Sequence, residues 1–250
     1  MILAIDATNW IHVLWHTQPG PDLAQTVATR VKVLAESLRA THIVAAFDRR
    51  SFRRDLCPAY KAHREAKPAD LVAALAAAEE AVAAVATIAA EVGFEADDQL
   101  ATLARLGVAA GERVVLASPD KDVRQCLMDG WVSILRKFSV SQGAITKPEW
   151  LTARQLGRET GLVPAQWPDY QALCGDPTDG IQGCPGIGPK TAAAILVKCQ
   201  TLRGCWANPF AMPVTPAKRE AVLKFRGVAD LVLQLVTLRT DCQAAADALR

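Results

Sequence analysis

The sequence predicts an α/β fold with a mainly parallel sheet, followed by an α-helical region. Three short apolar runs stop at or near an aspartate, and helical patterns lie between them. Later in the chain, a glycine-rich hairpin leads into a further helical run. Strands that alternate with helices favour a parallel sheet. The 250 residues are enough for one large domain or two small ones, each with a buried core.

The predicted strands share one design. Each is four or five residues long, carries no charge and is rich in β-branched side chains, as is typical of buried parallel strands. A fourth strand is expected at residues 131–135. The first three strands and the acids that follow them are residues 2–5 before Asp6, residues 43–47 before Asp48, and residues 114–117 before Asp120.

Helices are expected between these strands. Residues 25–39 repeat apolar side chains at helical spacing, and residues 97–106 do the same with leucine. Residues 70–92 are rich in alanine and carry Glu79, Glu80 and Glu91, so this stretch is predicted to be a helix of a soluble domain and not a membrane span.

Acidic residues gather where the strands end. A single aspartate after a strand is ordinarily a turn or capping residue. However, the carboxyl ends of parallel strands meet at one edge of the sheet, where ligands bind. Further acids open the predicted helix at 97, follow Asp120, or lie in the turn at 175–180. The candidate carboxylates are Asp6, Asp48, Glu95, Asp97, Asp98, Asp120, Asp122, Asp176 and Asp179.

So many carboxylates cannot share a site without cations, because like charges raise one another's pKa. Ligands that are all oxygen favour the hard ions Mg²⁺ or Mn²⁺. A broad acidic cluster suits two metal ions about 4 Å apart, an arrangement that supports hydrolysis of phosphodiesters. Asp6, Asp48 and Asp120 are the acids expected to be essential for catalysis.

A basic segment follows Asp48. It interleaves aromatic residues with cations, a pattern that is commonly a solvated face but here indicates contact with a phosphate backbone and an unpaired base. On a helix, Lys61 and Arg64 would share one face. The seven cations are Arg49, Arg50, Arg53, Arg54, Lys61, Arg64 and Lys67, and the aromatic residues are Phe52 and Tyr60.

The hairpin at 183–188 precedes an apolar helical run. Gly186 and Gly188 permit a tight turn with close backbone approach, and Pro189 suits the first turn of a helix. Lys190 and Thr191 lie where free N–H groups can bind phosphate without reading a base. The pattern is that of a helix-hairpin-helix element.

Taken together, these motifs resemble the 5′ nuclease family, which contains flap endonucleases and 5′→3′ exonucleases. The resemblance runs over most of the chain. It implies a PIN-like core at residues 1–160, with a basic arch at about 49–75, and a helix-three-turn-helix region with C-terminal helices at 161–250. The motifs are Ile5-Asp6, Phe47-Asp48, Phe52-Arg53, Tyr60-Lys61, Glu95-Ala-Asp97-Asp98, Ser118-Pro-Asp120-Lys-Asp122, Asp176-Pro-Thr-Asp179 and Gly186-Ile-Gly188.

The resemblance also implies residue roles. Six acids form or support one metal site, and Asp122, Asp176 and Asp179 build a second. Lys61 and Arg64 engage the scissile phosphate, and Tyr60 packs on a base. Arg53 and the hairpin residues contact DNA, and the hairpin holds a potassium ion. The six acids of the first site are Asp6, Asp48, Glu95, Asp97, Asp98 and Asp120.

The sequence thus favours a metal-dependent nuclease that cuts DNA at 5′ flaps or 5′ ends, with RNA primers on DNA as a further expected substrate. A PIN-type ribonuclease and a non-catalytic protein that binds branched DNA are the alternatives. We expect a monomer in the cytoplasm, associated with the nucleoid, and no membrane partner. The seven scattered cysteines indicate reduced thiols.

The net charge of +2 conceals a separation of charge. Nine of the 26 acids belong to the candidate site, which leaves 17 acids against 28 lysines and arginines. The remaining surface is therefore basic and suited to attract DNA, around a pocket that excludes phosphate until cations fill it.

Overall fold

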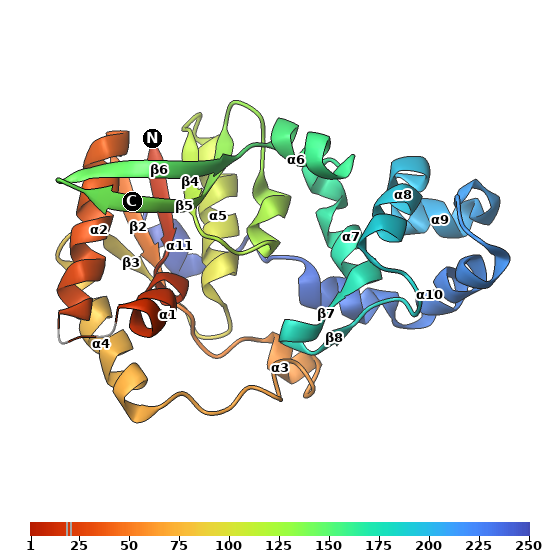
Figure 1. The fold of residues 1–250 in the computed structure, drawn as a ribbon, viewed down its shortest axis with the longest axis horizontal. Helices are drawn as coiled ribbons and strands as arrows, with labels where there is room; N and C mark the ends of the chain where they lie inside the picture. The colour runs from red at the N-terminus through yellow and green to blue at the C-terminus, as the bar shows by residue number, and fades with distance from the viewer. Residues whose placement is uncertain (19, 21) are drawn as a thin grey trace. The chain divides into compact units, whose positions relative to one another are not determined.

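The computed structural model describes residues 1–18, 20 and 22–250, and its chain forms two compact units (Figure 1). We call them the sheet unit and the helical unit. Each is assembled from separate stretches of sequence. The sheet unit comprises residues 1–51, 65–152 and 239–250, and the helical unit comprises residues 52–64 and 153–238.

The sheet unit contains one six-stranded sheet and its flanking helices. Its strands are β1 (Ile2–Asp6), β2 (His42–Ala46), β3 (Thr87–Ala89), β4 (Val114–Ala117), β5 (Val132–Ser141) and β6 (Ala144–Leu151). Its helices are α1 (Ala7–Thr17), α2 (Leu23–Leu38), α4 (Ala69–Ala83), α5 (Ala96–Ala109), the 3₁₀ turn η1 (Asp122–Cys126) and α11 (Gln243–Asp247).

The sheet has the strand order β3-β2-β1-β4-β5-β6. All neighbouring pairs are parallel except β5–β6, so the predicted α/β class with a mainly parallel sheet is confirmed. Ile5 of β1 pairs with Ala45 of β2 and with Ala117 of β4. This register brings the residues that follow β1, β2 and β4 to the same edge.

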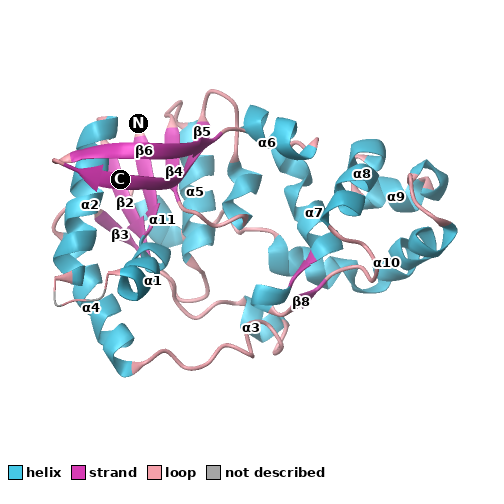
Figure 2. Cartoon of the chain, viewed as in Figure 1, coloured by secondary structure: helices cyan, strands magenta, loops and turns pink. Residues whose placement is uncertain are grey.

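Helices cover both faces of the sheet (Figure 2). Leu3 and Ile5 point to the face where α1, α2 and α4 pack. The alternate residues Ile2 and Val114 point to the other face, against α5. Gly107 of α5 lies so close to this face that an added Cβ would be 2.4 Å from Val114 Cγ2 and 2.8 Å from Ile2 Cδ1. Glycine therefore allows α5 to approach the sheet closely.

Two of the predicted elements differ in extent. The helix expected over residues 70–92 ends at Ala83, and the next residues form β3, because Thr87 and Ile88 complete a parallel ladder beside β2. The strand expected at 131–135 continues to Ser141 and turns into β6. The turn residues Gln142 and Gly143 have φ of 51° and 74°, values suited to a tight hairpin.

Helix α1 was not predicted, although its start has a local signal. Asp6 is the N-cap residue, and its Oδ1 accepts a hydrogen bond from the backbone N–H of Asn9 at 2.9 Å. The capping role that is ordinary for an aspartate after a strand was set aside for Asp6 in favour of a ligand role, and the helix that it begins was not predicted.

The helical unit packs short helices around its own apolar core. Ala172 of α7, Ile195 and Leu196 of α8 and Phe225 of α10 are among its buried residues. Its elements are α3 (Arg53–Leu56), α6 (Ala153–Thr160), η2 (Pro164–Gln166), α7 (Trp167–Cys174), β7 (Gly175–Asp176), η3 (Pro177–Asp179), β8 (Ile181–Gln182), α8 (Pro189–Cys199), α9 (Leu202–Ala207), η4 (Pro209–Ala211) and α10 (Pro216–Val236).

The state of the cysteines agrees with the reduced thiols that the sequence predicts. All seven cysteines are free thiols, and three of them, Cys184, Cys205 and Cys242, are buried. In the described part of the chain, no helix combines the length and the apolar character needed to cross a membrane.

Candidate metal centre

Asp6 lies at the carboxyl end of β1 and is only 4% exposed. Besides the bond from Asn9 to its Oδ1, its Oδ2 accepts a hydrogen bond from the Ser118 hydroxyl at 3.0 Å. Ser118 follows β4, so the bond joins the ends of two adjacent strands. The side chain of Asp6 is therefore fixed on both oxygens.

Asp48 connects the end of β2 to two helices. Its backbone N–H donates to Thr8 Oγ1 in α1 at 2.8 Å, and its Oδ1 accepts from the backbone N–H of Ala96 in α5 at 2.8 Å. A carboxylate at a helix N-terminus is stabilised by the free N–H groups there. Asp48 thus brings the first turn of α5, with Glu95 as its N-cap residue, to the edge where the strands end.

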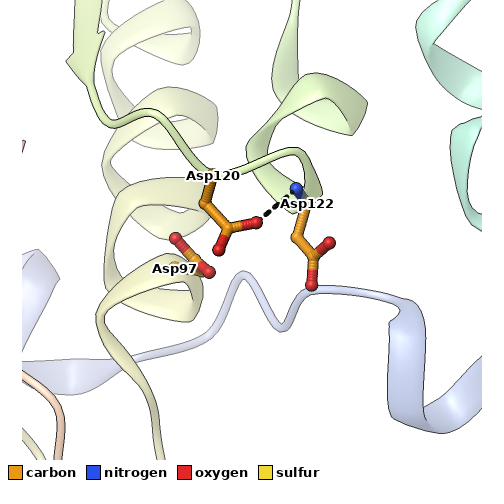
Figure 3. Close-up of side chains that lie close together, drawn as sticks. All are labelled: Asp97, Asp120 and Asp122. Carbon is orange, nitrogen blue, oxygen red and sulfur yellow. Dashed lines mark hydrogen bonds between the residues drawn. The ribbon is translucent and has the colours of Figure 1, made fainter. Parts of the chain in front are cut away.

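Three carboxylates meet at this edge (Figure 3). Asp97 comes from the first turn of α5, Asp120 from the loop after β4, and Asp122 from the start of η1. One carboxylate oxygen of each lies within 4.8 Å of the others. The backbone N–H of Asp122 donates to Asp120 Oδ1 at 2.8 Å, which fixes the loop between them.

Burial and mutual repulsion raise the pKa of two acids at this edge. Burial, and after it the charge of the neighbouring Asp48, raise the pKa of Asp6 to about 7, although the hydrogen bonds from Asn9 and Ser118 oppose the rise. Burial also raises the pKa of Asp97 well above its usual range, with contributions from Asp120 and Asp6. Close, part-buried carboxylates of this kind are a donor set that fits a hard divalent cation.

Asp98 is the second acid of the Asp97-Asp98 pair. It was predicted to form or support the first metal site, and its side chain is fully buried and bonded to backbone groups. Its Oδ2 accepts from the backbone N–H of Glu95 at 3.0 Å, and its Oδ1 accepts from the backbone N–H of Arg239 at 2.9 Å. Asp98 therefore fixes the start of α5 and the segment after Leu238, and Asp97 is the acid of the pair that faces the cluster.

In the helical unit, Asp176 ends β7 and Asp179 ends the η3 turn that leads to β8, and both are buried. Asp176 Oδ1 accepts from the backbone N–H of Thr178 at 3.0 Å. Asp179 is paired with two cations of the basic segment: Arg64 NH2 is 2.7 Å from its Oδ1, and Lys61 Nζ is 3.6 Å from its Oδ2. The sequence-predicted Lys61 and Arg64 are thus brought together by one carboxylate.

The segment that carries these cations is not the helix on which a shared face was expected. Residues 58–63 form successive turns, and Lys61 has a φ of 52°. The backbone N–H of Lys61 donates to the Asp179 carbonyl at 2.8 Å. Gly180, at φ 72°, lies so close that an added Cβ would be 2.8 Å from the Ala59 carbonyl. Contact with the β7–β8 turn, and not helix periodicity, places Lys61 and Arg64 on the same side.

Two residues predicted to contact DNA are buried. Tyr60 is 3% exposed, packs in the core of the helical unit and donates its hydroxyl to Asp179 Oδ2 at 3.2 Å. Arg53 is 2% exposed, and its Nε donates to the Leu235 carbonyl at 2.7 Å. Neither side chain presents a free surface to a base or a phosphate, so both have structural roles in this fold.

The hairpin residues are placed as the sequence predicts. Gly186 has a φ of 74°, Gly188 is the N-cap residue of α8, and both are exposed. Lys190 and Thr191 lie in the first turn of α8 and line an open cavity of about 670 Å³. Lys218 of α10, which belongs to none of the predicted motifs, lines the same cavity, and its Nζ is 3.5 Å from Thr191 Oγ1.

Comparisons with known proteins show the family to which the chain belongs. A family model described as the 5′-3′ exonuclease N-terminal resolvase-like domain matches residues 2–156, and one described as the 5′-3′ exonuclease C-terminal SAM fold matches residues 162–249. The chain therefore belongs to the 5′-3′ exonuclease family, as the motifs indicated.

Among individual relatives, flap endonuclease Xni of Vibrio parahaemolyticus is 33% identical over 252 residues, which cover 97% of this chain and 92% of the relative. DNA polymerase I of Mycobacterium tuberculosis is 35% identical over 208 residues, or 80% of this chain. That match spans only 22% of the polymerase.

A solved structure of T5 5′-exonuclease with bound divalent metal ions (zinc) has a TM-score of 0.80 at 22% identity. The match covers 100% of this chain and 93% of that one. A bacteriophage T5 D15 flap endonuclease complex with DNA and metal ions has a TM-score of 0.78, also at 22% identity, over 99% of this chain and 93% of that one. At this identity the likeness establishes the fold alone.

Proposed function

We propose that the protein is a divalent-metal-dependent 5′ nuclease that hydrolyses DNA phosphodiesters at 5′ flaps and 5′ ends, as a flap endonuclease and 5′→3′ exonuclease. The observation that carries the proposal is the cluster of Asp97, Asp120 and Asp122 beside the buried Asp6, whose raised pKa calls for cations. Family membership and the flap endonuclease name of the Vibrio relative support the reaction class.

Asp6, Asp48, Glu95, Asp97 and Asp120 are proposed to hold Mg²⁺ or Mn²⁺ in the sheet unit, because all of their donors are oxygen atoms. For a second ion held by Asp122, Asp176 and Asp179, the support is the family resemblance. When bound, such ions supply charge neutralisation at the phosphate and activation of the attacking water.

The protein's own side chains position the substrate in this proposal. Lys61 and Arg64 donate hydrogen bonds to the oxygens of the scissile phosphate, and Asp179 holds both cations in place before the substrate arrives. The exposed hairpin with Lys190 and Thr191 contacts the duplex backbone, where carbonyl groups near Gly186 and Gly188 hold a potassium ion. These contacts recognise DNA by its phosphates, without reading its sequence.

The proposed contacts to phosphate groups also bear on which nucleic acid is cut. We propose that a duplex with a 5′ flap or 5′ end is the principal substrate and that an RNA primer on DNA is also cut, because the contacts are to phosphate groups. We further propose that the protein acts as a monomer in the cytoplasm, at the nucleoid.

The test is a titration of Mg²⁺ with a labelled 5′-flap DNA and, in parallel, a single-stranded RNA. Cleavage of the flap DNA that requires the metal supports the proposal. Faster cleavage of the RNA favours the PIN-type ribonuclease, and DNA binding without any cleavage favours a non-catalytic branched-DNA-binding protein. Each outcome therefore supports one of the three candidate functions over the other two.

Two variants assign the roles of the residues. Asp122→Asn is expected to lower cleavage by orders of magnitude while DNA binding persists, and the exposed Asp230→Asn is its control.

Lys61→Ala is expected to slow cleavage with a smaller effect on duplex affinity, and the exposed Lys137→Ala is its control. Wild-type cleavage by Asp122→Asn would contradict the role of this acid, and a loss of affinity alone in Lys61→Ala would make Lys61 an ordinary backbone contact.

A further inference from the structure

Ser118 occupies a position that the proposed reaction does not yet explain. It follows β4 directly, and its side chain is fully buried. Because β1 and β4 pair in parallel with Ile5 opposite Ala117, Ser118 is the cross-strand neighbour of Asp6. A buried hydroxyl at the sheet edge where the carboxylates gather must form hydrogen bonds, and both of its bonds involve the acidic cluster.

The direction of these bonds is fixed by the donors available. The backbone N–H of Asp120 donates to Ser118 Oγ at 3.1 Å, so the hydroxyl accepts there. Its single proton is then donated to Asp6 Oδ2, at 3.0 Å. The serine therefore connects a carboxylate at the end of β1 to the backbone of the loop after β4.

The connection reaches a third acid. The loop that Ser118 holds continues to Asp122, whose backbone N–H donates to Asp120 Oδ1 at 2.8 Å. On the other side, the second oxygen of Asp6 is fixed by Asn9. One hydroxyl thus lies at the centre of a hydrogen-bonded series that runs from α1 through Asp6 to Asp120 and the start of η1.

We propose that Ser118 is a positioning residue that holds Asp6 and the Asp120 loop in the arrangement that binds the divalent metal. This inference rests on the proposed function, since it concerns the same acidic cluster. Groups that orient metal-binding side chains typically change metal affinity by about 10- to 100-fold when they are removed. The carboxylates would remain in Ser118→Ala, but they would no longer be fixed relative to one another.

The experiment measures metal binding directly. Mn²⁺ is titrated calorimetrically into the full chain without DNA at pH 8, and the Mg²⁺ dependence of flap cleavage is measured separately. For Ser118→Ala we expect Mn²⁺ to bind about 10- to 100-fold more weakly than to the wild type. We also expect the Mg²⁺ concentration for half-maximal cleavage to rise more than the maximal rate falls. Ser118→Thr, which keeps the hydroxyl, should recover most of the metal affinity.

Thr102 provides a matched control in the same unit. Its buried hydroxyl donates to the Asp98 carbonyl at 2.9 Å and accepts from the backbone N–H of Cys242 at 3.2 Å. Thr102→Val removes a similar pair of bonds from a site away from the clustered carboxylates. It should lower the melting temperature, as Ser118→Ala does, but leave the Mn²⁺ affinity unchanged.

The outcomes separate this inference from the proposed function. If Ser118→Ala lowers the melting temperature while Mn²⁺ affinity and the Mg²⁺ midpoint stay at wild-type values, Ser118 is merely structural and the inference is overturned. The same holds if Ser118→Thr binds Mn²⁺ as weakly as Ser118→Ala. If the wild type itself neither binds Mn²⁺ nor cuts the flap, the proposed function fails first.

Discussion

Single residues of the acidic cluster carry an electrostatic cost in the absence of cations. Asp6 and Asp97 have a raised pKa because they are buried beside other carboxylates. Sites that must bind a charged ligand often keep such unfavourable interactions at the expense of stability. Removing one negative charge from the cluster should therefore stabilise the metal-free protein and weaken metal binding.

Asp97→Asn tests this trade-off. The Asp97 Oδ1 atom is buried and accepts no hydrogen bond, so the amide relieves repulsion without breaking a bond at that atom. We expect a melting temperature several degrees above that of the wild type in EDTA, corresponding to roughly 1 kcal/mol, and a large loss of Mg²⁺-dependent cleavage. Thermal unfolding followed by circular dichroism measures the first effect.

Asp98→Asn is the matched control one residue further along α5. Both oxygens of Asp98 accept backbone N–H bonds, and an amide group can accept on only one side. This variant should be less stable than the wild type, both in EDTA and with Mg²⁺. Equal melting temperatures for the two variants would contradict the different roles assigned to these neighbours.

The pH dependence follows from the same raised pKa values. An unfolded aspartate has a pKa of about 3.9, whereas burial beside Asp48 raises the pKa of Asp6 in the metal-free fold to about 7. Between these values the folded state binds more protons than the unfolded state. The stability that Asp6 contributes relative to an ionised side chain is therefore fully present below about pH 4 and is lost as the pH rises through 7.

Accordingly, the difference in EDTA between the melting temperatures of Asp97→Asn and the wild type should grow from pH 5 to pH 8. Protons and metal compete for the same oxygens, so the calorimetric affinity of the wild type for Mn²⁺ should increase over the same range. A difference that is constant with pH would mean that Asp97 is ionised throughout.

At the scale of elements, the short helix α3 depends on a partner far along the chain. Four residues do not form a stable helix in isolation. Arg53 supplies the anchor: its guanidinium donates to the carbonyl groups of Leu235 and Thr237, at the end of α10. Because α3 leads into the turns that carry Lys61 and Arg64, this anchor also supports the position of these two cations.

Arg53→Met should therefore affect both folding and cleavage. The buried carbonyl groups would lose a charged donor, which we expect to cost about 1–3 kcal/mol of unfolding free energy. The rate of flap cleavage should also fall under conditions in which the variant is fully folded. Urea unfolding and single-turnover cleavage measure the two effects. Arg54→Met, in the same helix but exposed, should stay within about 0.5 kcal/mol of the wild type.

At the scale of the whole molecule, charge is distributed unevenly. The nine candidate acids are a third of the acidic residues, and the remaining 17 face 28 cations. A basic surface that binds DNA through phosphates releases counterions, so its affinity falls linearly with salt on a double logarithmic scale. Duplex binding should therefore depend steeply on salt and weakly on base sequence.

Lys190→Ala tests the contribution of the hairpin to this surface. We expect weaker binding to every duplex sequence and a salt slope reduced by about 1, as for the loss of one phosphate contact. Fluorescence anisotropy at several salt concentrations, with Ca²⁺ in place of Mg²⁺, provides the measurement. An unchanged slope would show that Lys190 lies outside the DNA contact, and Lys137→Ala is the control.

Local patterns were sufficient to predict much of this protein. The parallel strands could be recognised because short, uncharged, β-branched runs are typical of buried strands, and the acids at their ends follow from the topology. The glycine hairpin and α8 were likewise predicted from turn and capping residues. The end of α4 and the strand β3 were not, because alanine is compatible with a helix until pairing with β2 decides the structure.

The sequence by itself therefore determined the fold class, the family and the set of acids and cations proposed for the site. Only the tertiary structure decided which of them face the cluster. Asp97 and Asp98 are adjacent aspartates, but successive residues of a helix point in different directions, and one hydrogen-bond donor to Asp98, the backbone N–H of Arg239, is 141 residues away. Contacts over such separations likewise bury Arg53 and Tyr60, because a side chain's partner depends on how distant segments pack.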